Sequence, residues 1–590
     1  LSRIFFDRRD PSQYFFTDPY DFCVQRPEDV IFTNTFSPFT NLSYYKGGGS
    51  RDGEERFKSY FAINANKRLG FGFYIDYLYG RGLYQDQSTA FFNGGLFSSY
   101  RGDKYDMHFI FNNDNLKMAE NGGITDDRYI TNPLDMAEGK KEYSANEIPT
   151  RLSQIWNHNT SYHAFLTHRY NLGFYKEKQD SVDTDSVKIT QVFVPVTSFI
   201  HTLQVDLNNR KYISYDDAQN QKYFEHNYLG TDSIDKTKRT SIKNTIGIAL
   251  QEGFNKWAKA GLTAFLSYEY RNFALTDTTN IPGQRIINNY KESSLSIGGE
   301  LSKKQGKLLH YNILGELAIA GEDAGQFSVE GRGDLNLRLF GDTVRLDVNA
   351  FIKNQNPVFY FRHFQSKHYW WDNNDLSKIM RTRLEGKLSL NRWGTQLRAG
   401  VENIKNYTYL ANASIPVKDS EGNVTGFKNN AAVRQHSGNI QIFTAMLQQK
   451  LKVGIFHLDG EVAYQKSSEQ DILPLPELSA YGNLYMKFGL AKKVLQIEMG
   501  ADVRYFSKYY APDYSPVIGQ FYNQNPDDKI EIGAFPIVNV YANLHLKRTR
   551  FFIMMYHVNA GSGKSNYFLA PHYPINPRMI KFGLSWNFFD

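Results

Sequence analysis

The chain alternates between apolar and polar residues over many segments of about ten residues. The last segment is typical, with an apolar row of Ile580, Phe582, Leu584, Trp586 and Phe588 and a row of Lys581, Gly583, Ser585 and Asn587 between them. Residues 328–339, 344–350, 383–390 and 495–505 repeat the pattern. Successive side chains of a strand point to opposite faces, so this period of two predicts β-strands. So many alternating strands in a row favour a transmembrane β-barrel over a soluble antiparallel sheet.

The connections between these segments alternate in length as well. Short turns are expected near 67–70, 101–104, 251–255, 303–307, 341–343, 392–395, 452–455, 491–493 and 547–550. Longer polar segments lie between them, at 113–156, 208–238, 411–437, 507–532 and 561–577. Outer-membrane barrels have short periplasmic turns and long extracellular loops, so we expect the C-terminus in the periplasm. The fold class predicted is all-β, a single large antiparallel barrel of about 22 strands, in a range of roughly 16 to 22.

The predicted barrel occupies residues 33–590, and residues 1–32 alternate poorly. They contain several charged residues and two prolines, which predicts an extended arm on the periplasmic side or a partial plug. Closure of a barrel requires that its first and last strands pair. We therefore expect residues 39–46 to pair with residues 579–589.

The composition changes this picture little. The chain has 590 residues with 40 Tyr and 44 Phe, and aromatic girdles of a barrel use many such rings. An aromatic-rich soluble sandwich or a carbohydrate-binding protein would also be rich in aromatics. No apolar run approaches the roughly 18 to 20 residues of a spanning helix. The single cysteine, Cys23, excludes an internal disulfide, and the net charge of +7 is spread along the chain, which disfavours nucleic acid.

Four segments resemble a known family. They are the residues 535–560, the motif His168-Arg-Tyr-Asn-Leu-Gly-Phe174, the motif Val196-Thr-Ser-Phe-Ile-His201 that follows Phe193-Val-Pro195, and the closing Lys581-Phe-Gly-Leu-Ser-Trp-Asn-Phe-Phe-Asp590. These strand and turn signatures are similar to those of the putative porin family of Bacteroidetes. The resemblance implies a Gram-negative outer-membrane barrel. It also makes the last strand, with Phe582, Leu584, Trp586, Phe588 and Phe589, the segment that the barrel-insertion machinery would read.

The motifs that suggest catalysis or metal binding are weak. Residues 561–565 (Gly-Ser-Gly-Lys-Ser) look like a phosphate-binding loop, but they lie between strands and open no helix. His158, His163 and His168 are five residues apart, which places neighbours on opposite faces of a strand. Acidic pairs at 54–55 and 527–528 are better explained as solvated loop charge than as calcium ligands. We therefore expect no enzyme activity, no catalytic residues, no cofactor and no metal site.

The polar rows predict a charged lumen. The residues expected to face it are Glu330, Arg332, Asp334, Arg338, Arg345, Asp347, Arg383, Glu385, Lys387, Arg398, Glu402, Asp459, Glu461, Glu498, Asp502 and Arg504. Unpaired charges in a dry interior would cost several kcal/mol each, so the lumen must hold water or a polar plug. The mixed signs predict no strong preference for cations or anions. A constriction would come from the N-terminal arm, from another subunit or from residues 113–156, which are the first candidate because they form the longest loop.

Two functions remain open. The first is a porin for passive diffusion of small hydrophilic solutes. The alternative is a structural or interaction subunit of a larger outer-membrane assembly, for secretion, barrel insertion or glycan uptake, with a closed lumen. The aromatic segment 360–371 supports it, because clustered aromatics and Arg are typical of interfaces; the same rings could line a membrane girdle or stack on sugars. Expected partners are outer-membrane lipid and lipopolysaccharide, the barrel-insertion machinery, and other outer-membrane proteins or lipoproteins.

Overall fold

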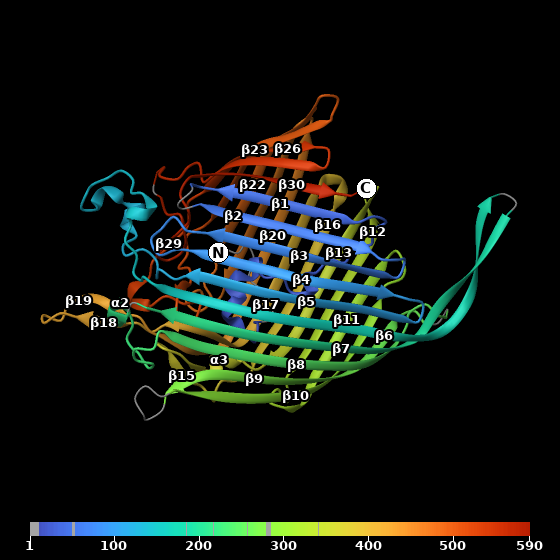
Figure 1. The fold of residues 1–590 in the computed structure, drawn as a ribbon, viewed down its shortest axis with the longest axis horizontal. Helices are drawn as coiled ribbons and strands as arrows, with labels where there is room; N and C mark the ends of the chain where they lie inside the picture. The colour runs from blue at the N-terminus through green and yellow to red at the C-terminus, as the bar shows by residue number, and fades with distance from the viewer. Residues whose placement is uncertain are drawn as a thin grey trace.

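A computed structural model describes residues 11–49, 53–183, 186–215, 217–255, 258–278, 285–339, 341–563 and 565–589. Its main feature is one antiparallel sheet of 22 strands that closes into a barrel (Figure 1). The strands are β1 (Phe39–Gly47), β2 (Glu54–Asn64), β3 (Leu69–Gly80), β4 (Thr89–Arg101), β5 (Tyr105–Ala119), β6 (Ile155–Asp183), β7 (Ser186–Ser214), β8 (Ile234–Leu250), β9 (Gly261–Thr278), β10 (Arg285–Lys303), β11 (Leu309–Gly321), β12 (Phe327–Leu339), β13 (Asp342–Gln355), β16 (Ile379–Leu390), β17 (Thr395–Asn412), β20 (Ala431–Val453), β21 (Phe456–Ser467), β22 (Leu478–Leu490), β23 (Leu495–Phe506), β26 (Ile537–Leu546), β27 (Thr549–Tyr556) and β30 (Met579–Phe588). The predicted fold and strand number are confirmed.

The barrel closes where the sequence predicts it. Strand β1 pairs with β2 on one side and with β30 on the other, and in the closing pair Leu42 lies opposite Trp586. Strand β30 in turn pairs with β27. No strand of the ring is therefore left with an open edge along its membrane-spanning part, as a lipid environment requires.

The two ends of the barrel differ. Each short turn expected from the sequence coincides with a connection between consecutive strands, and these turns lie at one end, on the right of Figure 1. The long connections lie at the other end, where the strands reach further into the expected loops than the alternation indicates; β5, for example, continues to Ala119. Near this point its lumen-facing Leu116 and Met118 are apolar and pack with Cys23, while Asn113, Asn115 and Lys117 on the other face are polar, so the outward apolar row ends before the strand does. We call these two ends the short-turn end and the long-loop end.

One hairpin at the short-turn end is much longer than the other connections there. Strands β6 and β7 have 29 residues each and pair with each other from Ile155↔Ser214 to Asp183↔Ser186. Their outer neighbours stop earlier, because β5 pairs with β6 only as far as Tyr170 and β8 pairs with β7 only from Thr197. The rest forms a two-stranded ribbon, 171–183 with 186–196, that projects from the short-turn end (Figure 1). At about 3.3 Å per residue it extends roughly 40 Å. The pattern of apolar and polar residues does not predict this ribbon.

The outward face of the barrel carries the predicted apolar rows. Ile580, Phe582 and Trp586 of β30 are among its exposed side chains, and Leu384 and Val401 continue the exposed row on β16 and β17. Ile497 also lies in an outward row but is largely buried, with Phe488 and Leu544 as its cross-strand neighbours. Among the described residues, no helix is both long and apolar enough to cross a membrane.

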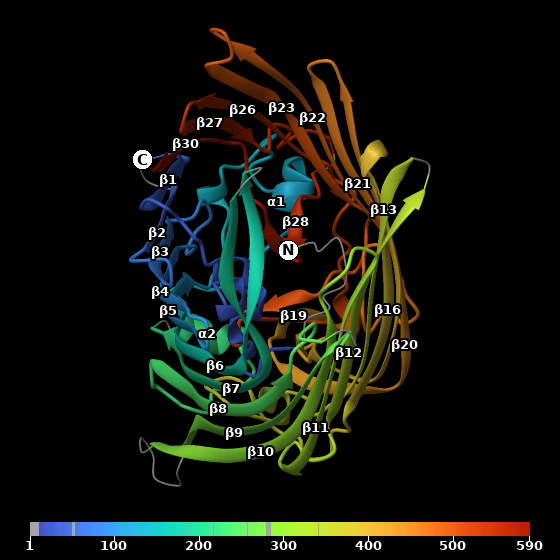
Figure 2. The same cartoon turned by 90° about the vertical axis from the view of Figure 1, so that its right-hand side faces the viewer.

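The lumen contains part of the chain itself. Residues 11–38 precede β1 and lie inside the ring of strands, with the 3₁₀-helix η1 (Phe15–Cys23) at their centre (Figure 2); we call them the inner segment. Loops from the long-loop end fold in beside it. The other short elements are η2 (Pro27–Asp29), α1 (Arg128–Thr131), η3 (Pro133–Asp135), η4 (Ala145–Glu147), α2 (Asp217–Tyr223), α3 (Phe359–Arg362), η5 (Asn391–Trp393), η6 (Pro526–Asp528) and the strand pairs β14 (His363–Gln365) with β15 (Trp370–Asp372), β18 (Ile415–Lys418) with β19 (Val424–Lys428), β24 (Asp513–Ser515) with β25 (Gln520–Tyr522) and β28 (Phe568–Ala570) with β29 (Tyr573–Pro574).

Candidate functional site

The lumen is the candidate site, and an aromatic core fills its long-loop half. This core joins the inner segment, the β13–β16 loop and the β23–β26 loop; its buried members from these three segments are Tyr14, Phe15, Phe16, Val358, Phe359, Tyr360, Phe364, Tyr369, Trp371, Val517, Ile518 and Tyr522. The ring of Phe359 stacks on Phe273 of β9 with centroids 3.8 Å apart. We call these three segments together the plug.

The inner segment is bonded to one side of the barrel wall. Its backbone carbonyls accept hydrogen bonds from Asn93 of β4 and from Asn112 of β5 (2.8 Å), and the Tyr14 hydroxyl donates to Asn159 Oδ1 of β6 (2.9 Å). Nearer the short-turn end, the Tyr60 hydroxyl of β2 donates to the Ile31 carbonyl (2.9 Å). Polar residues on the lumen face of β2 to β6 thus satisfy the backbone of a segment that has little regular structure of its own.

A buried arginine connects the wall to the plug. Arg210 of β7 is 1% exposed, and its guanidinium lies 4.7 Å from the ring centroid of Phe16. It donates hydrogen bonds to Asn157 Oδ1 (2.6 Å) and to the carbonyl of Val517. One cation therefore holds both the inner segment and the β23–β26 loop, because it contacts a residue of each.

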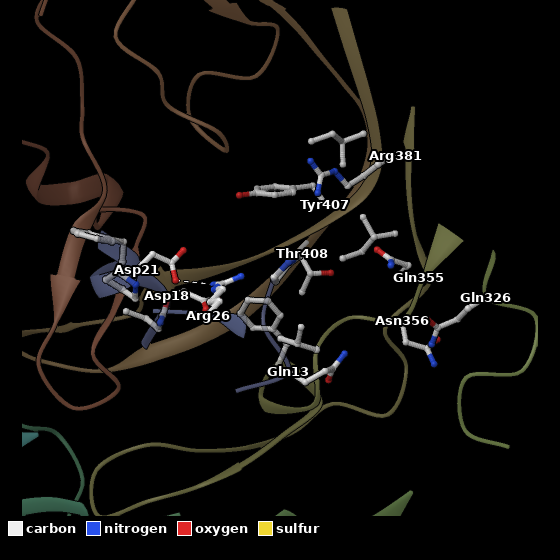
Figure 3. A pocket seen from close by; sticks show the side chains of 18 residues that line it. Gln13, Asp18, Asp21, Arg26, Gln326, Gln355, Asn356, Arg381, Tyr407 and Thr408 are labelled. Atoms are coloured by element: carbon white, nitrogen blue, oxygen red, sulfur yellow. Dashed lines mark hydrogen bonds and ion pairs between the residues drawn. The ribbon is translucent and has the colours of Figure 1, made fainter. Parts of the chain in front are cut away.

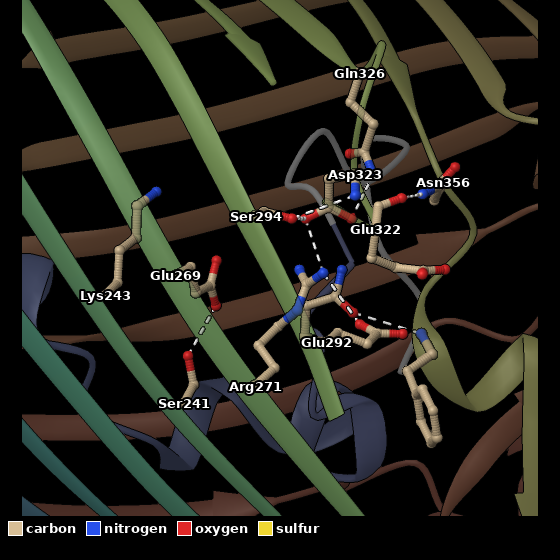
Figure 4. A network of polar contacts seen from close by, with 12 residues as sticks. Ser241, Lys243, Glu269, Arg271, Glu292, Ser294, Glu322, Asp323, Gln326 and Asn356 are labelled. Carbon is tan, nitrogen blue, oxygen red and sulfur yellow. Dashed lines mark hydrogen bonds and ion pairs between the residues drawn. The ribbon is translucent and has the colours of Figure 1, made fainter. Parts of the chain in front are cut away.

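A second network anchors the β13–β16 loop (Figure 4). Arg362 forms ion pairs with Glu292 of β10 (2.7 Å) and Glu322 (2.8 Å), and Arg271 of β9 pairs with Glu292 (3.0 Å) and Asp323 (2.8 Å). The Arg271 and Glu292 side chains are almost fully buried. Buried charges are tolerated here because each carboxylate has a guanidinium partner.

The predicted lumen residues form two groups. Arg383 and Glu402 lie opposite each other on β16 and β17, form an ion pair of 2.8 Å and are buried, and Arg383 also pairs with Glu385 (2.8 Å). Nearer the short-turn end, Asp347 pairs with Arg345 (2.8 Å) and with Lys387 (3.2 Å). The side chains of Arg345 and Lys387 keep 50% and 40% of their surface exposed, so water reaches this part of the lumen.

The remaining predicted residues continue these rows. Arg398 pairs with Glu385, Glu330 with Lys353, Asp334 with His310, and Glu498 with Lys487; Asp502 accepts from Asn539, Glu461 accepts from Gln448, Arg504 lies over the Tyr481 ring, Asp459 lies opposite Asn483, and Arg332 and Arg338 are exposed. The alternation therefore places these residues on one face. It missed Arg210, Arg271 and Glu292, although the same period of two continues through β7, β9 and β10.

Two expectations concern the loops, and the structure contradicts the second. The first candidate for the constriction, within 113–156, forms residues 120–154 between β5 and β6 and lies over the long-loop end, where Ile124, Ile130 and Ile148 pack with Phe535 and other loop residues. It contributes Leu152 to the aromatic core, but most of that core comes from elsewhere. The aromatic segment 360–371 is neither a girdle nor an exposed interface, because most of its rings are buried in the plug.

Two of the cavities around the plug are defined by the residues of their walls. The inner cavity, of about 360 Å³, lies between the inner segment and the wall of β13, β16 and β17, and Figure 3 shows Asp21, Arg26 and Arg381 pointing into it. The outer pocket, of about 500 Å³, lies among the loops of the long-loop end. Both have charged, amide and aromatic side chains in their walls, as binding sites for small polar molecules do.

The histidines that the sequence singles out as candidate metal ligands do not come together. Among the described residues, no group of three or more His, Cys, Asp or Glu is placed to hold a metal ion. The three histidines of β6 have separate neighbours: His158 contacts Asn115, His163 contacts Asp206, and His168 contacts His201.

Comparisons with known proteins agree with the barrel. A family model described as "Putative porin" matches residues 1–590. Among solved structures, the chain resembles the siderophore receptor PirA from Acinetobacter baumannii (10% identity, TM-score 0.61), the ferric enterobactin receptor PfeA from Pseudomonas aeruginosa (12%, 0.60) and the copper transporter OprC (10%, 0.59). Each alignment covers 94% of this chain and 81 or 82% of the other. No curated protein sequence matches the chain. At these identities the structures show a shared barrel fold.

Proposed function

The chain belongs to the Putative porin family, and from that premise we propose that it lets small hydrophilic solutes diffuse passively across an outer membrane. The short-turn end, with the C-terminus, faces the periplasm and the long loops face outward, as in other bacterial barrels. The plug restricts this passage, so that the barrel has a narrow route instead of a wide pore. The lipid and lipopolysaccharide of the membrane surround it, and the barrel-insertion machinery acts on its last strand.

The observation that carries this proposal is the water-accessible lumen near the short-turn end. Arg345, Asp347 and Lys387 form a partly exposed cluster of paired charges on the wall. A barrel that served only as a scaffold would not need a charged, hydrated interior below its plug. The paired signs favour weak charge selectivity.

The solved relatives give a weaker kind of support. Their names describe two siderophore receptors and a copper transporter, which are barrels that handle solutes. With 10 to 12% identity, they do not indicate which solute this chain takes.

Flux measurements test the proposal. Purified protein in liposomes should allow swelling in a neutral pentose and in glycine, and planar bilayers should show small, steady, weakly selective channels. Protein-free liposomes and liposomes with heat-denatured protein are the controls. A correctly folded barrel that passes neither solute and carries no current would overturn the porin proposal. An epitope placed between β18 and β19 tests orientation, because it should be accessible on intact cells.

The projecting ribbon favours the second candidate, a subunit of a larger assembly. It leaves the barrel at a β-bulge between Leu172 and Gly173, where Asn171 donates to Asp106 (3.1 Å) and accepts from Ser198 (2.5 Å). The bulge and the hydrogen bonds where the ribbon leaves the barrel indicate that the ribbon is a defined feature of the fold. An isolated two-stranded ribbon is marginally stable in water, so a partner protein would stabilise it.

Native purification separates the two candidates. Replacing residues 174–194 by an Asn-Gly turn should leave the barrel folded. If the chain is an assembly subunit, this variant should lose chains that co-purify with the intact protein, whereas a variant with residues 416–427 shortened at the other end should keep them. Identical co-purifying chains in all three preparations would remove the support that the ribbon gives to this candidate.

A further inference from the structure

The outer pocket is built from five separate loop regions of the long-loop end. Arg151, Lys222, Asp513, Asp528 and His572 contribute charged or titratable groups to its wall. Burial raises the pKa of the Asp513 carboxyl, although His572 partly offsets this. Amide side chains at its rim are used to fix the loops; Asn525, for example, donates to the Ser414 carbonyl (3.1 Å). The pocket is thus a cavity between loops that hydrogen-bond to one another.

The inner cavity lies on the opposite side of the inner segment from the wall that binds it. The hydrogen bonds described above connect this segment to β2, β4, β5 and β6. Facing the cavity from the other wall are Arg381, Tyr407 and Thr408. Space remains on this side because the side chains of β16 and β17 pair among themselves; Arg381, for instance, pairs with Glu402 (2.9 Å).

One hairpin separates the two cavities. The residues of β24, β25 and the stretch that follows line both: Asp513, Gln524 and Asn525 lie in the wall of the outer pocket, and Gln520 and Phe521 in the wall of the inner cavity. Residues that line the two cavities are therefore only a few positions apart in the sequence of this hairpin.

This hairpin is fastened to the barrel wall at the end of β17. The backbone N–H of Asn412 donates to the backbone carbonyl of Asn523 (2.8 Å), and the backbone N–H of Asn523 donates to the backbone carbonyl of Leu410 (2.9 Å). Ala411 and Asn523 form an isolated parallel bridge between these two hydrogen bonds. The Tyr522 hydroxyl accepts a further hydrogen bond from Asn429 (2.9 Å). Separation of this contact would join the pocket to the cavity, and it would also move Val517, Ile518 and Tyr522, the members of the aromatic core that the hairpin carries.

We propose that the outer pocket and the inner cavity are the two ends of one passage for small uncharged or zwitterionic polar solutes, and that the β24–β25 hairpin is its gate. This inference rests on the proposed function, because it assumes that solutes cross the barrel. It adds the route, the gate and the class of solute.

The charges along this route give the solute class. In the outer pocket, Arg151 and Lys222 are balanced by Asp513 and Asp528. The wall of the inner cavity carries Asp18, Asp21, Arg26 and Arg381, two charges of each sign, and Arg26 pairs with Asp21 at 2.7 Å. A solute with a net charge gains no favourable field from balanced pairs and loses hydration in a narrow passage. A neutral or zwitterionic solute can instead exchange its water contacts for those donors and acceptors.

A reversible disulfide across the gate tests the proposal. Bridged residues on adjacent strands have Cα atoms within the roughly 4.4–6.8 Å that a disulfide needs, so Ala411→Cys with Asn523→Cys should crosslink in a Cys23→Ser background. Oxidised protein in liposomes should swell about tenfold more slowly in a pentose or in glycine than reduced protein, because the gate is locked. Dithiothreitol should restore the rate.

Matched variants make the outcome decisive. Ile415→Cys with Lys428→Cys places a disulfide in the exposed β18–β19 hairpin, where oxidation should not change the rate. The two single variants of the gate pair should not respond to oxidation either. If a fully crosslinked gate passes solute as fast as the reduced protein, the gate is wrong, while the proposed function survives. If the reduced and oxidised proteins both pass nothing, the proposed function fails with it.

The solute class has its own measurement. The reduced protein should pass a pentose and glycine at similar rates and pass a monovalent organic anion and a monovalent organic cation of the same size more slowly. A clear preference for either ion over the neutral and zwitterionic solutes would overturn this part of the proposal.

Discussion

The two halves of the lumen treat charge in opposite ways. In the long-loop half, Arg210 and Arg271 are 1% and 4% exposed, and each contacts the plug or the carboxylates that anchor it. In the short-turn half, the side chains of Arg345, Lys487 and Arg169 keep 50%, 49% and 46% of their surface exposed. On the same lumen face of the same sheet, charged side chains are thus buried with fixed partners in the long-loop half and exposed to water in the short-turn half.

This difference follows from what each half has to hold. A buried cation must have fixed partners, so the wall of the long-loop half selects one arrangement of the inner segment and loops. Exposed ion pairs contribute little free energy and tolerate rearrangement. The long-loop half is therefore where the plug fills the lumen, and the short-turn half is where charged side chains of the lumen remain exposed.

Removal of the inner segment should have the largest effect. A variant without residues 1–26 loses Tyr14, Phe15 and Phe16 from the aromatic core and most of one wall of the inner cavity. Single-channel conductance in planar bilayers should rise about tenfold or more, since a barrel of 22 strands is wide without a plug. Deletion of 416–427 from the exposed hairpin is the control and should not change it. Unchanged conductance in both variants would mean that the loops alone close the lumen.

Loss of one ring should come next. Phe359 is fully buried and stacks on Phe273, so Phe359→Ala should lower the free energy of unfolding by about 3–5 kcal/mol. Trp393 lies on a turn of the short-turn end and is 52% exposed, and Trp393→Ala should change stability by less than about 0.5 kcal/mol. Thermal unfolding in detergent compares the two. Equal losses would contradict the assignment of the aromatic core to the filled half.

The barrel itself could be read from the sequence, and the reason is geometric. A strand that faces lipid on one side must alternate, and a short turn must interrupt the alternation, so rows such as Leu346 and Val348 on β13 and the turn near 341–343 were sufficient. Pairing of the first and last strands then follows from closure. The alternation also placed Arg383 and Glu402 on one face, where they form an ion pair.

The contents of the lumen could not be read in the same way. The plug joins residues near 15, 360 and 517, and no period relates segments so far apart in sequence. The rings of 360–371 are typical of an interface, and an interface is what they form, but with other parts of the same chain. The ribbon was missed for a related reason: β6 and β7 keep their strand character beyond the point where β5 and β8 end, and a single strand's sequence does not show where its neighbours stop.

Two arginines test the contrast between the halves directly. Arg210→Met removes the hydrogen bonds to Asn157 and Val517 and leaves buried acceptors, which should destabilise the docked plug by about 1–3 kcal/mol. Arg345→Met removes an exposed ion pair and should cost about 0–1 kcal/mol. Cys23 reports on docking, because burial raises the pKa of its thiol to about 11 and shields it from maleimide. Labelling should accelerate in the first variant only. Similar labelling rates in both would show that the two halves do not differ in this respect.

Loss of a single proton is the smallest change, and it acts at the top of the filled half. Glu120 follows β5, is 4% exposed, and accepts hydrogen bonds from Asn157 (2.6 Å) and from the Tyr514 hydroxyl of β24 (2.8 Å). Burial raises its pKa to about 8, an effect that these two hydrogen bonds and Arg210 only partly offset. A free glutamate has a pKa of about 4.3, so the docked state binds more protons between these two values.

Docking should therefore weaken as the pH rises. The stabilisation from the protonated carboxyl is fully present below about pH 4.3 and is lost as the pH rises through about 8, the docked value. Between pH 6 and pH 9, the rate of Cys23 labelling, corrected for the reagent's own pH dependence with a small thiol, should rise severalfold. Glu120→Gln keeps a neutral hydrogen-bonding side chain and should flatten this profile, whereas Glu498→Gln in the short-turn half should leave it unchanged. If the pH profile persists in Glu120→Gln, another group is responsible for the pH dependence of plug docking.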